Sequence, residues 1–379
     1  MTEIILNNVS VQNSWYTINN PGEVNSPALL IYPYRIEQNI KKMISISGDP
    51  DMLRPHVKTH KMPEIVRMQK NHGIRKFKCA TIAEAEMTAG CGAEEILLAY
   101  QPVGPNINRF FGLKKKFTEI KISCIADCGD VIRQLSENAV KNNTVTSVWL
   151  DINNGMNRTG VTPGEEAYKL FKMISDLPML QPEGLHVYDG QIHENDFSLR
   201  EKFCNDAFLP VKSLLSDLAR SGSGRVKVVA GGTPTFPIHA KRSGVETSPG
   251  TTLLWDYGYS SSFADLDFLH AAILFSRVIS KPESDLICID LGTKAVSSEM
   301  PQPRVKITGL ANYEFVSHNE EHMVIRTSEA SKISIGDVFY CIPYHICPTV
   351  DRFDKVSVVR NGKVTEQWKV EARKREITV

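Results

Sequence analysis

Two histidines and a lysine stand at alternate positions in the segment RPHVKTHK, which spans residues 54–61. Alternate side chains of an extended strand point to the same face, so we expect His56, Lys58 and His60 to share one face. A lysine held among other cations at such a site is a candidate for forming a Schiff base with a carbonyl compound. A solvated basic loop is the alternative for a cluster of this composition.

A pair of potential metal ligands lies near the C-terminus, in the segment 341–351. His345 and Cys347 are separated by one residue, so on an extended segment they point the same way and could bind one metal ion. Two protein ligands leave coordination positions open for water or substrate, which is typical of a catalytic rather than a structural site. Buried packing is the commoner explanation for an isolated pair of this kind.

A glycine-rich turn follows the apolar run at 226–230 and consists of Gly231, Gly232 and Thr233. Glycines let backbone N–H groups converge on an anion, and threonine hydroxyls add further donors. The run comes late in the series of predicted strands, where barrel enzymes often bind phosphate. This position favours a phosphate site over the ordinary alternative, a turn without a ligand.

Two further loops follow apolar runs and carry residues that could contact a planar ligand. Arg158 lies in the Gly- and Asn-rich loop DINNGMNRTGV, where a guanidinium can bind a phenolate or carboxylate through two hydrogen bonds. The segment GLHVYDGQIHE carries His186, Tyr188 and His193. The tyrosine could stack on a ring and His193 could act as a base. A surface arginine, a core tyrosine and a solvent-exposed histidine are the alternatives.

Short apolar runs alternate with helix-like segments from about residue 28 to 256. The runs are ALLIY (28–32), HVKTH (56–60), KFKCAT (76–81), EILLAY (95–100), KISCIAD (121–127), SVWLDI (147–152), GLHVYDG (184–190), VKVVAGG (226–232) and TTLLW (251–255). Apolar strands that are each followed by a helix suit a parallel sheet whose outer side the helices cover. These nine runs exceed a (β/α)8 barrel by one. We therefore predict an α/β fold with a (β/α)8 barrel, preceded by the run 28–32 and closed by the run 251–255 or the stretch just before it.

The pattern changes after about residue 265, where the segments become short and rich in β-branched residues. The sequence RNGK at 360–363 carries an Asn-Gly pair between two strand-like runs, which is a strong signal for a β-hairpin. We predict that residues 26–264 form the barrel and residues 265–379 form a C-terminal all-β domain that carries the metal pair. Residues 1–25 are expected to add to that β domain.

The composition limits the classes of partner. The 379 residues contain 44 Lys+Arg and 43 Asp+Glu, a formal net charge of +1, so no large nucleic-acid footprint is expected. No apolar run approaches the roughly 20 residues of a membrane span, so no membrane partner is expected. The segment MTEIILNNVSVQNSW lacks the features of a secretory signal. The 8 cysteines form no CxxC pair and indicate thiols of a reducing compartment, so a cytoplasmic location is expected.

Together these motifs resemble the D-threonine aldolase and D-serine dehydratase group of pyridoxal-phosphate enzymes, which are fold-type III relatives of alanine racemase. RPHVKTHK is the most specific motif, the P-x-H-I-C-P segment is the next, and the resemblance covers about residues 20–375. It implies a (β/α)8 barrel followed by a β domain, assembled as a homodimer. The implied substrate is a small D-amino acid.

The resemblance also implies roles for the residues of the barrel. Lys58 matches the lysine that carries pyridoxal 5'-phosphate, and we place His56 beside the cofactor. Arg158 is similar to the arginine near the cofactor's phenolic oxygen, and Tyr188 is similar to the tyrosine beside the pyridine ring. The implied phosphate contacts are Gly231, Gly232 and Thr233.

For the C-terminal pair the resemblance implies a divalent metal ion, zinc or manganese, on His345 and Cys347, and a thiolate ligand favours zinc over magnesium. Lys58 and His193 are the predicted acid–base groups. We predict a lyase that cleaves D-3-hydroxy amino acids into glycine and an aldehyde. A D-serine dehydratase-like elimination to a 2-oxo acid and ammonia is the alternative. A racemase, a non-catalytic pyridoxal-phosphate carrier and a sugar-phosphate barrel enzyme are less favoured.

Overall fold

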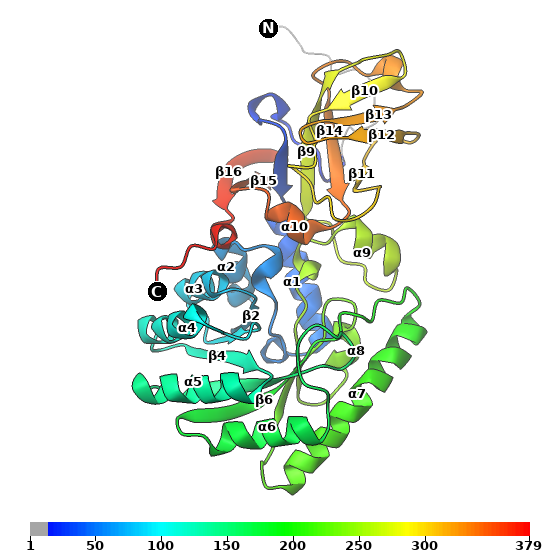
Figure 1. The fold of residues 1–379 in the computed structure, drawn as a ribbon. Coiled ribbons are helices and arrows are strands. Elements are labelled where there is room, and N and C mark those ends of the chain that lie inside the picture. Colours follow the sequence, from blue (N-terminus) through cyan, green and yellow to red (C-terminus); the bar gives the residue numbers. More distant parts are fainter. Residues whose placement is uncertain (1–13) are drawn as a thin grey trace. The chain divides into compact units, whose positions relative to one another are not determined.

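The computed structural model describes residues 14–379, which form two compact units (Figure 1). The first, here called the β unit, consists of residues 14–38, 253–261 and 268–370. The second, here called the barrel unit, consists of residues 39–252, 262–267 and 371–379. The first thirteen residues of the predicted N-terminal segment lie outside the described residues. Among the described residues, no helix is long and apolar enough to span a bilayer.

Seven parallel strands form the sheet of the barrel unit and follow one another in sequence order. They are β2 (Lys76–Cys79), β3 (Glu95–Leu98), β4 (Lys121–Ala126), β5 (Thr146–Ile152), β6 (Leu180–Val187), β7 (Lys227–Ala230) and β8 (Val245–Thr247). The helices between them are α3 (Ile82–Gly90), α4 (Pro105–Lys116), α5 (Gly129–Lys141), α6 (Glu165–Asp176), α7 (Phe197–Arg220) and α8 (Phe236–Ala240). Two more helices, α1 (Pro33–Ser47) and α2 (Pro63–Asn71), precede β2.

The sequences of these helices explain where they begin and which face they bury. Helix α3 begins after Thr81, whose hydroxyl accepts the backbone N–H of Glu84 at 3.1 Å, which satisfies one of the donors that a helix start leaves unpaired. The buried residues of α6 are Ala167, Leu170, Phe171 and Ile174. Their spacing of three and four places them on one apolar stripe, and α6 packs with this stripe against β5 and β6.

The segment around residues 53–56 closes the sheet into a barrel. Leu53 forms a parallel bridge with Thr247 of β8, and His56 forms a parallel bridge with Lys78 of β2. The Lys78 N–H donates to the carbonyl of Pro55 at 2.9 Å. Because Pro55 has no N–H to donate, this segment makes isolated bridges rather than a regular strand. The prediction of an α/β barrel is confirmed, with this irregular segment in the eighth position.

The interior of the barrel is filled by apolar side chains and by the buried guanidinium of Arg54. Trp149 of β5 is fully buried and donates its indole N–H to the Ser123 hydroxyl at 3.1 Å. Arg54 is 1% exposed and forms ion pairs with Glu95 at 2.7 Å and Glu246 at 2.8 Å. A buried charge requires such pairing. Arg54, although part of the RPHVKTHK motif, therefore stabilises the barrel itself.

Two of the nine predicted strands are helical in the structure, and one belongs to the other sheet. The run 56–60 contains a 3-10 helix, Val57–Thr59, and the run 251–255 begins with another, Thr251–Leu253. The last barrel strand is β8, so the stretch just before 251–255 is the one that completes the sheet. The run 28–32 precedes the barrel, as expected, and forms β1 (Ala28–Ile31) of the β unit.

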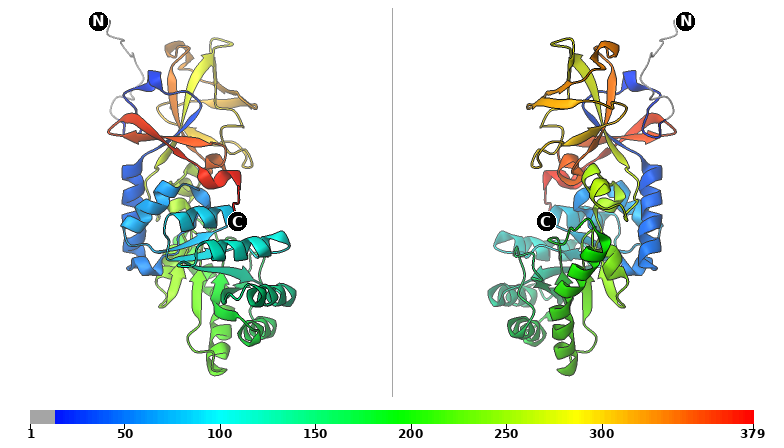
Figure 2. Two further views of the ribbon diagram at one scale, coloured as in Figure 1. Left: turned by 90° about the vertical axis from the view of Figure 1, so that its left-hand side faces the viewer. Right: turned by 90° about the vertical axis from the view of Figure 1, so that its right-hand side faces the viewer.

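A nine-stranded sheet forms the β unit. Besides β1 it contains β9 (Ala272–Ser280), β10 (Leu286–Ile289), β11 (Val305–Ile307), β12 (Glu314–His318), β13 (Met323–Arg326), β14 (Val338–Pro343), β15 (Lys355–Arg360) and β16 (Lys363–Lys369). Strand β1 pairs with β9 and β15, so it lies beside strands from the last third of the chain (Figure 2). Two short helices, α9 (Tyr257–Ser262) and α10 (Ile346–Val350), complete the unit.

The predicted hairpin at RNGK is confirmed. Strands β15 and β16 pair antiparallel, and Asn361 and Gly362 between them have φ angles of 51° and 72°. Two consecutive residues with positive φ are the signature of a tight hairpin turn whose twist matches that of the strands.

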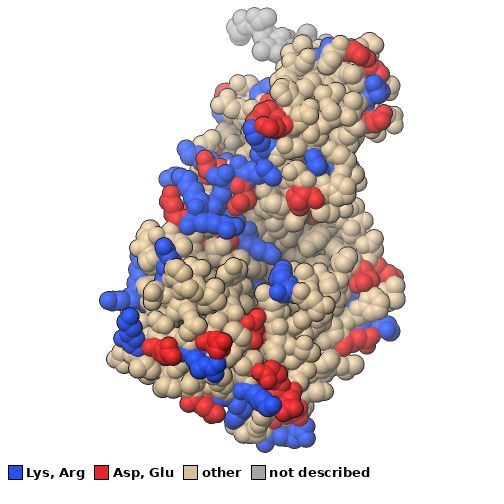
Figure 3. All heavy atoms as spheres, viewed as in Figure 1, with Lys and Arg blue, Asp and Glu red and all other residues tan. Residues whose placement is uncertain are grey.

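Charged side chains of both signs are scattered among other residues over the face drawn in Figure 3. This distribution agrees with the formal net charge of +1.

Candidate functional site

The carboxyl ends of the barrel strands carry the residues predicted to bind the cofactor. Arg158 lies in the loop after β5, Tyr188 directly follows β6, and the turn 231–233 directly follows β7. Lys58 directly follows the closing segment, which runs parallel to β2 and β8. Functional groups of parallel barrels gather at this end of the strands.

Lys58 is exposed and lies in the 3-10 helix Val57–Thr59. Its backbone N–H donates to Nδ1 of His56 at 3.3 Å. The expectation that His56, Lys58 and His60 share one strand face is wrong, because a helical turn spreads successive side chains around its axis. His60 is fully buried, and its Nδ1 accepts the N–H of Met62 at 3.1 Å.

The imidazole of His56 is neutral. Burial, followed by the charges of Lys58 and Lys78, holds the pKa of His56 well below its usual range. Because Nδ1 accepts the Lys58 N–H, the ring proton resides on Nε2. His56 can therefore offer one N–H donor beside Lys58.

The Tyr188 ring lies at the end of β6, with two cations and a glycine around it. The guanidinium carbon of Arg158 lies 4.9 Å from the centre of the Tyr188 ring, and the Lys78 amine lies 5.8 Å from it. Gly232 lies against the same ring, since a Cβ at this position would be 3.1 Å from Tyr188 Cε2. The structure thus brings together Arg158, Tyr188 and Gly232, which are far apart in the sequence.

Lys78 is a site residue that the sequence reasoning missed. It lies in β2 and is only 3% exposed. Burial, with the charge of Lys58, lowers the pKa of Lys78 to about 7, although Asp151 and Asp189 act in the opposite direction. The available signal was a lysine between the apolar residues of a short strand, where a buried charge is rare.

Replacing Lys78 with methionine is expected to raise the free energy of unfolding by about 1–4 kcal/mol at pH 7. The unfolded state of the native chain binds a proton at Lys78 up to a pKa near 10.5, whereas the folded state releases it near 7. Native stability should therefore rise with pH across this window, and the variant's advantage should shrink toward pH ~10. Urea unfolding at several pH values measures the stability of the native chain and the gain in the variant. A gain that grows with pH would contradict the lowered pKa of Lys78.

Asp151 and His186 form a buried pair at the ends of β5 and β6. Oδ1 of Asp151 lies 2.7 Å from Nδ1 of His186. Burial acts to raise the pKa of Asp151, but the hydrogen bond from His186 holds it below its usual range. Nε2 of His186 is buried and has no hydrogen-bond partner among the described residues. Such an unpaired atom can accept or donate a proton to a ligand.

The turn 231–233 is held by hydrogen bonds within the barrel unit. Gly231 has a φ of 79°, and its N–H donates to the carbonyl of Val187 at 3.0 Å. The Gly232 N–H donates to the hydroxyl of Thr235 at 3.2 Å. The N–H groups of both glycines, which we expected to face an anion, are therefore bonded within the fold.

The loop after β8 supplies a donor that the sequence reasoning missed. Its residues Gly250 and Thr251 donate their N–H groups to the Thr233 hydroxyl, each at 3.2 Å, so this loop lies directly on the glycine turn. The Ser248 hydroxyl in the same loop is buried and has no partner among the described residues. An unpaired buried hydroxyl beside a glycine turn fits the oxygens of a phosphate group.

His193, the predicted second acid–base group, is exposed on the loop after β6. Its Nδ1 lies 2.7 Å from the carbonyl oxygen of Gln191. This contact orients the ring within its own loop and does not involve Nε2. His193 remains a prediction.

The predicted metal pair lies where β14 ends and α10 begins in the β unit. His345 is the residue before α10 and Cys347 lies in its first turn, so the pair is not on an extended segment. The two side chains are nevertheless hydrogen-bonded to each other. Nδ1 of His345 also lies 2.6 Å from Oε1 of Glu299. Burial acts to lower the pKa of His345, but Cys347 and Glu299 raise it to about 9.

Glu299 adds a carboxylate to the pair of His345 and Cys347. Asp256 holds the backbone between these two residues. Oδ2 of Asp256 accepts the N–H of Ile346 at 3.0 Å, and burial raises the pKa of Asp256 to about 6. An imidazole, a thiol and a carboxylate on neighbouring residues are the donor set that zinc prefers. The sequence reasoning missed Glu299 because it lies on a different segment from the His-x-Cys pair.

Two family models match the chain. The alanine racemase N-terminal domain matches residues 31–257, and a putative serine dehydratase domain matches residues 271–359. The first match covers more than half of the chain. This chain belongs to the alanine racemase N-terminal domain family. The predicted resemblance to the D-threonine aldolase and D-serine dehydratase group is confirmed.

Relatives of this family member cover nearly its whole length. D-threonine aldolase of Arthrobacter sp. is 29% identical over 364 residues, which are 93% of this chain and 95% of that protein. A 3-hydroxy-D-aspartate aldolase of Paracoccus denitrificans (strain Pd 1222) is 27% identical over 93% of both chains. The crystal structure of D-threonine aldolase from Filomicrobium marinum superimposes with a TM-score of 0.85 at 25% identity, covering 95% of this chain and 98% of that chain. The family member is an enzyme of the lyase class.

Proposed function

We propose that this enzyme cleaves D-3-hydroxy amino acids into glycine and an aldehyde, using pyridoxal 5'-phosphate and a divalent metal ion. The observation that carries the proposal is the set of groups at the carboxyl end of one barrel. That set combines the exposed Lys58, the Tyr188 ring with cations beside it, and the unpaired buried hydroxyl of Ser248 beside the glycine turn. Similarity to D-threonine aldolase over 93% of the chain supports it.

The residues present fit the cofactor. Lys58 would carry it, and the Arg158 guanidinium would meet its phenolic oxygen beside the Tyr188 ring. Gly232 lies closely against this ring, where a Cβ would be 3.1 Å from Tyr188 Cε2. Ser248 and the Thr233 hydroxyl, which accepts two backbone N–H groups and keeps its own proton to donate, would meet its phosphate. When bound, pyridoxal phosphate acts as an electron sink for bonds to the substrate's Cα.

The residues of the β unit fit a divalent metal. His345 and Cys347 would bind it, and Glu299 would either join them or orient the imidazole through its hydrogen bond. The metal would supply a Lewis acid for the substrate's β-hydroxyl, and a thiolate ligand would favour zinc.

The chain's own acid–base groups must remove the hydroxyl proton and return a proton to carbon. Lys58 and His193 are the predicted groups, and positioned acid–base help is worth about 10²–10⁴-fold in rate. The structure adds His186 as a further candidate, because its Nε2 is unpaired while Asp151 holds its Nδ1. Zinc as the metal, a homodimer and a cytoplasmic location remain predictions.

Elimination to a 2-oxo acid and ammonia is the second candidate function. The match of residues 271–359 to a putative serine dehydratase domain favours it. Both reactions start from the same D-3-hydroxy amino acid and differ in whether the Cα–Cβ bond or the Cβ–oxygen bond breaks.

Product analysis separates the two functions. The enzyme loaded with pyridoxal phosphate and zinc or manganese is incubated separately with D-threonine, 3-hydroxy-D-aspartate and D-serine. We expect glycine and acetaldehyde from D-threonine and glycine and glyoxylate from 3-hydroxy-D-aspartate. L-Threonine serves as the stereochemical control. Formation of 2-oxobutyrate and ammonia from D-threonine would transfer the assignment to the dehydratase.

A further inference from the structure

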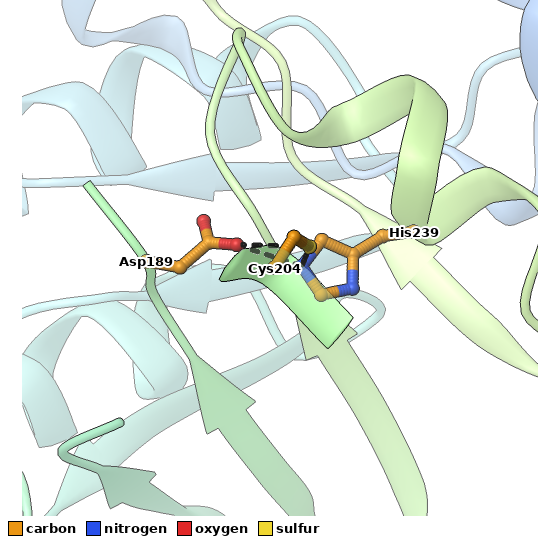
Figure 4. Close-up of side chains that lie close together, drawn as sticks. All are labelled: Asp189, Cys204 and His239. Atoms are coloured by element: carbon orange, nitrogen blue, oxygen red, sulfur yellow. Dashed lines mark hydrogen bonds and ion pairs between the residues drawn. The ribbon is translucent and has the colours of Figure 1, made fainter. Parts of the chain in front are cut away.

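A group of five polar residues, four of them buried, lies against the glycine turn and is called here the Asp189 cluster. It consists of Asp189 after β6, Cys204 of α7, Thr235 before α8, His239 of α8 and Arg242 after α8. The first four residues are at most 1% exposed. Three of them, Asp189, Cys204 and His239, point toward one another in Figure 4. The reaction proposed above uses none of these groups.

Hydrogen bonds run through the cluster from Arg242 to Thr235. The Arg242 Nε–H donates to Nδ1 of His239 at 3.2 Å, so the imidazole carries its proton on Nε2. That Nε2–H donates to Oδ2 of Asp189 at 2.8 Å. The Thr235 hydroxyl donates to Oδ1 of Asp189 at 2.7 Å. Both carboxylate oxygens of Asp189 are therefore held.

The cluster makes direct contact with the glycine turn. The Thr235 hydroxyl, having donated its proton to Asp189, accepts the N–H of Gly232 at 3.2 Å. The positive φ of Gly231 brings this residue close to the cluster. A Cβ on Gly231 would lie 2.9 Å from Cδ2 of His239 and 3.1 Å from the Thr235 hydroxyl. The glycine turn therefore packs directly against the cluster.

A metal ion is the other occupant to consider, since Asp189, Cys204 and His239 offer three ligand atoms within 4.8 Å of one another. The contacts favour a hydrogen-bonded cluster instead. Nε2 of His239 and both oxygens of Asp189 already have partners, and an Arg242 nitrogen lies 3.6 Å from the Cys204 sulfur. Burial and the Asp189 charge raise the pKa of Cys204 to about 12. A metal ion would have to displace this thiol proton as well as the hydrogen bonds of Asp189 and His239.

We propose that Thr235 and Asp189 are positioning residues that fix the glycine turn for the phosphate group of the cofactor, with His239 and Arg242 holding Asp189 in place. The proposal rests on the proposed function, because it assigns the turn to a phosphate monoester. The carboxylate of Asp189 does not repel that phosphate strongly, because Arg242 balances its charge through His239. In this proposal the cluster acts through the glycine turn and not on the cofactor's aldehyde or the substrate.

Comparison of two ligands tests the proposal without measuring turnover. Absorbance titration gives the affinity of the cofactor-free protein for pyridoxal 5'-phosphate and for pyridoxal, which lacks the phosphate. Thr235→Val keeps the shape of the side chain and removes both hydrogen bonds. We expect it to weaken binding of the phosphorylated ligand by about 10–100-fold and to leave pyridoxal binding within about twofold. Asp189→Asn should act in the same direction.

Conservative and distant variants control for damage to the fold. Thr235→Ser keeps the hydroxyl and should bind both ligands as the native protein does. Thr146→Val removes another buried threonine hydroxyl at the first residue of β5, the opposite end of the strands, and should leave the ratio of the two affinities unchanged.

Three results would overturn the proposal. An equal loss for both ligands in Thr235→Val would show a general structural role, and native-like binding in that variant would show no role. A bound metal ion that is lost in Cys204→Ser and kept in His345→Ala would identify the cluster as a metal site. If the native protein binds neither ligand, the proposed function fails together with this proposal. If the native protein binds both ligands and one of the three results is found, only this proposal fails.

Discussion

Replacing Lys58 with alanine is expected to abolish the visible absorbance band of lysine-bound pyridoxal phosphate and to reduce turnover by at least ~10²–10⁴-fold, the range that acid–base help alone supplies. Lys58 is exposed at the carboxyl end of the barrel, and its charge acts on Lys78, whose amine lies 5.8 Å from the centre of the Tyr188 ring. Spectra of the purified variant with added cofactor measure the band, and the product assay measures turnover.

Lys78 provides a matched control for this experiment. Its charge acts on His56, as that of Lys58 does, and it is buried where Lys58 is exposed. We expect Lys78→Met to keep the absorbance band. The reverse outcome, a band lost in Lys78→Met and kept in Lys58→Ala, would move the cofactor to the buried amine and refute the assignment of Lys58.

Replacing His345 or Cys347 with alanine is expected to remove the bound metal and most of the activity while leaving the cofactor band intact. The two side chains are neighbours in the β unit, whereas the predicted cofactor residues all belong to the barrel unit. The loss of activity should exceed the about 10–100-fold that removal of an outer-shell partner costs. Elemental analysis, absorbance and the product assay measure the three quantities.

Two further variants calibrate the metal experiment. Glu299→Gln keeps the size of the side chain and removes its charge beside His345, so we expect weakened metal binding rather than its abolition. His322→Ala removes an exposed histidine of the same unit and should change nothing. Full turnover by chelated, metal-free native enzyme would exclude a catalytic metal at this pair.

Local patterns in the sequence were sufficient for the fold class. Apolar runs alternating with amphipathic helices predicted a parallel barrel, and the Asn-Gly pair at 361–362 predicted the hairpin of β15 and β16. Both signals depend on neighbouring residues and on preferences of the backbone, which operate before any distant contact forms. The motif RPHVKTHK likewise pointed to Lys58, because its residue types and spacing are specific in themselves.

The same patterns failed where distant contacts decide the local conformation. The alternation around Lys58 predicted a strand. The bridges to β8 and β2 end at His56, and the next residues, Val57–Thr59, form a 3-10 helix. Burial of His60, and exposure of Lys58, follow from that turn. Period-two spacing in a short segment does not distinguish these conformations.

The partners of the predicted site residues were also decided by the tertiary structure. Glu299 reaches His345 from another segment of the β unit, and Ser248 approaches the glycine turn from the loop after β8. Residue types and spacing name the groups that can do chemistry, because those are properties of one short stretch of chain. Which groups meet, and which are buried away from water, depends on how the strands and loops pack. The lowered pKa of Lys78 and the contacts of the Asp189 cluster are therefore properties of the folded barrel.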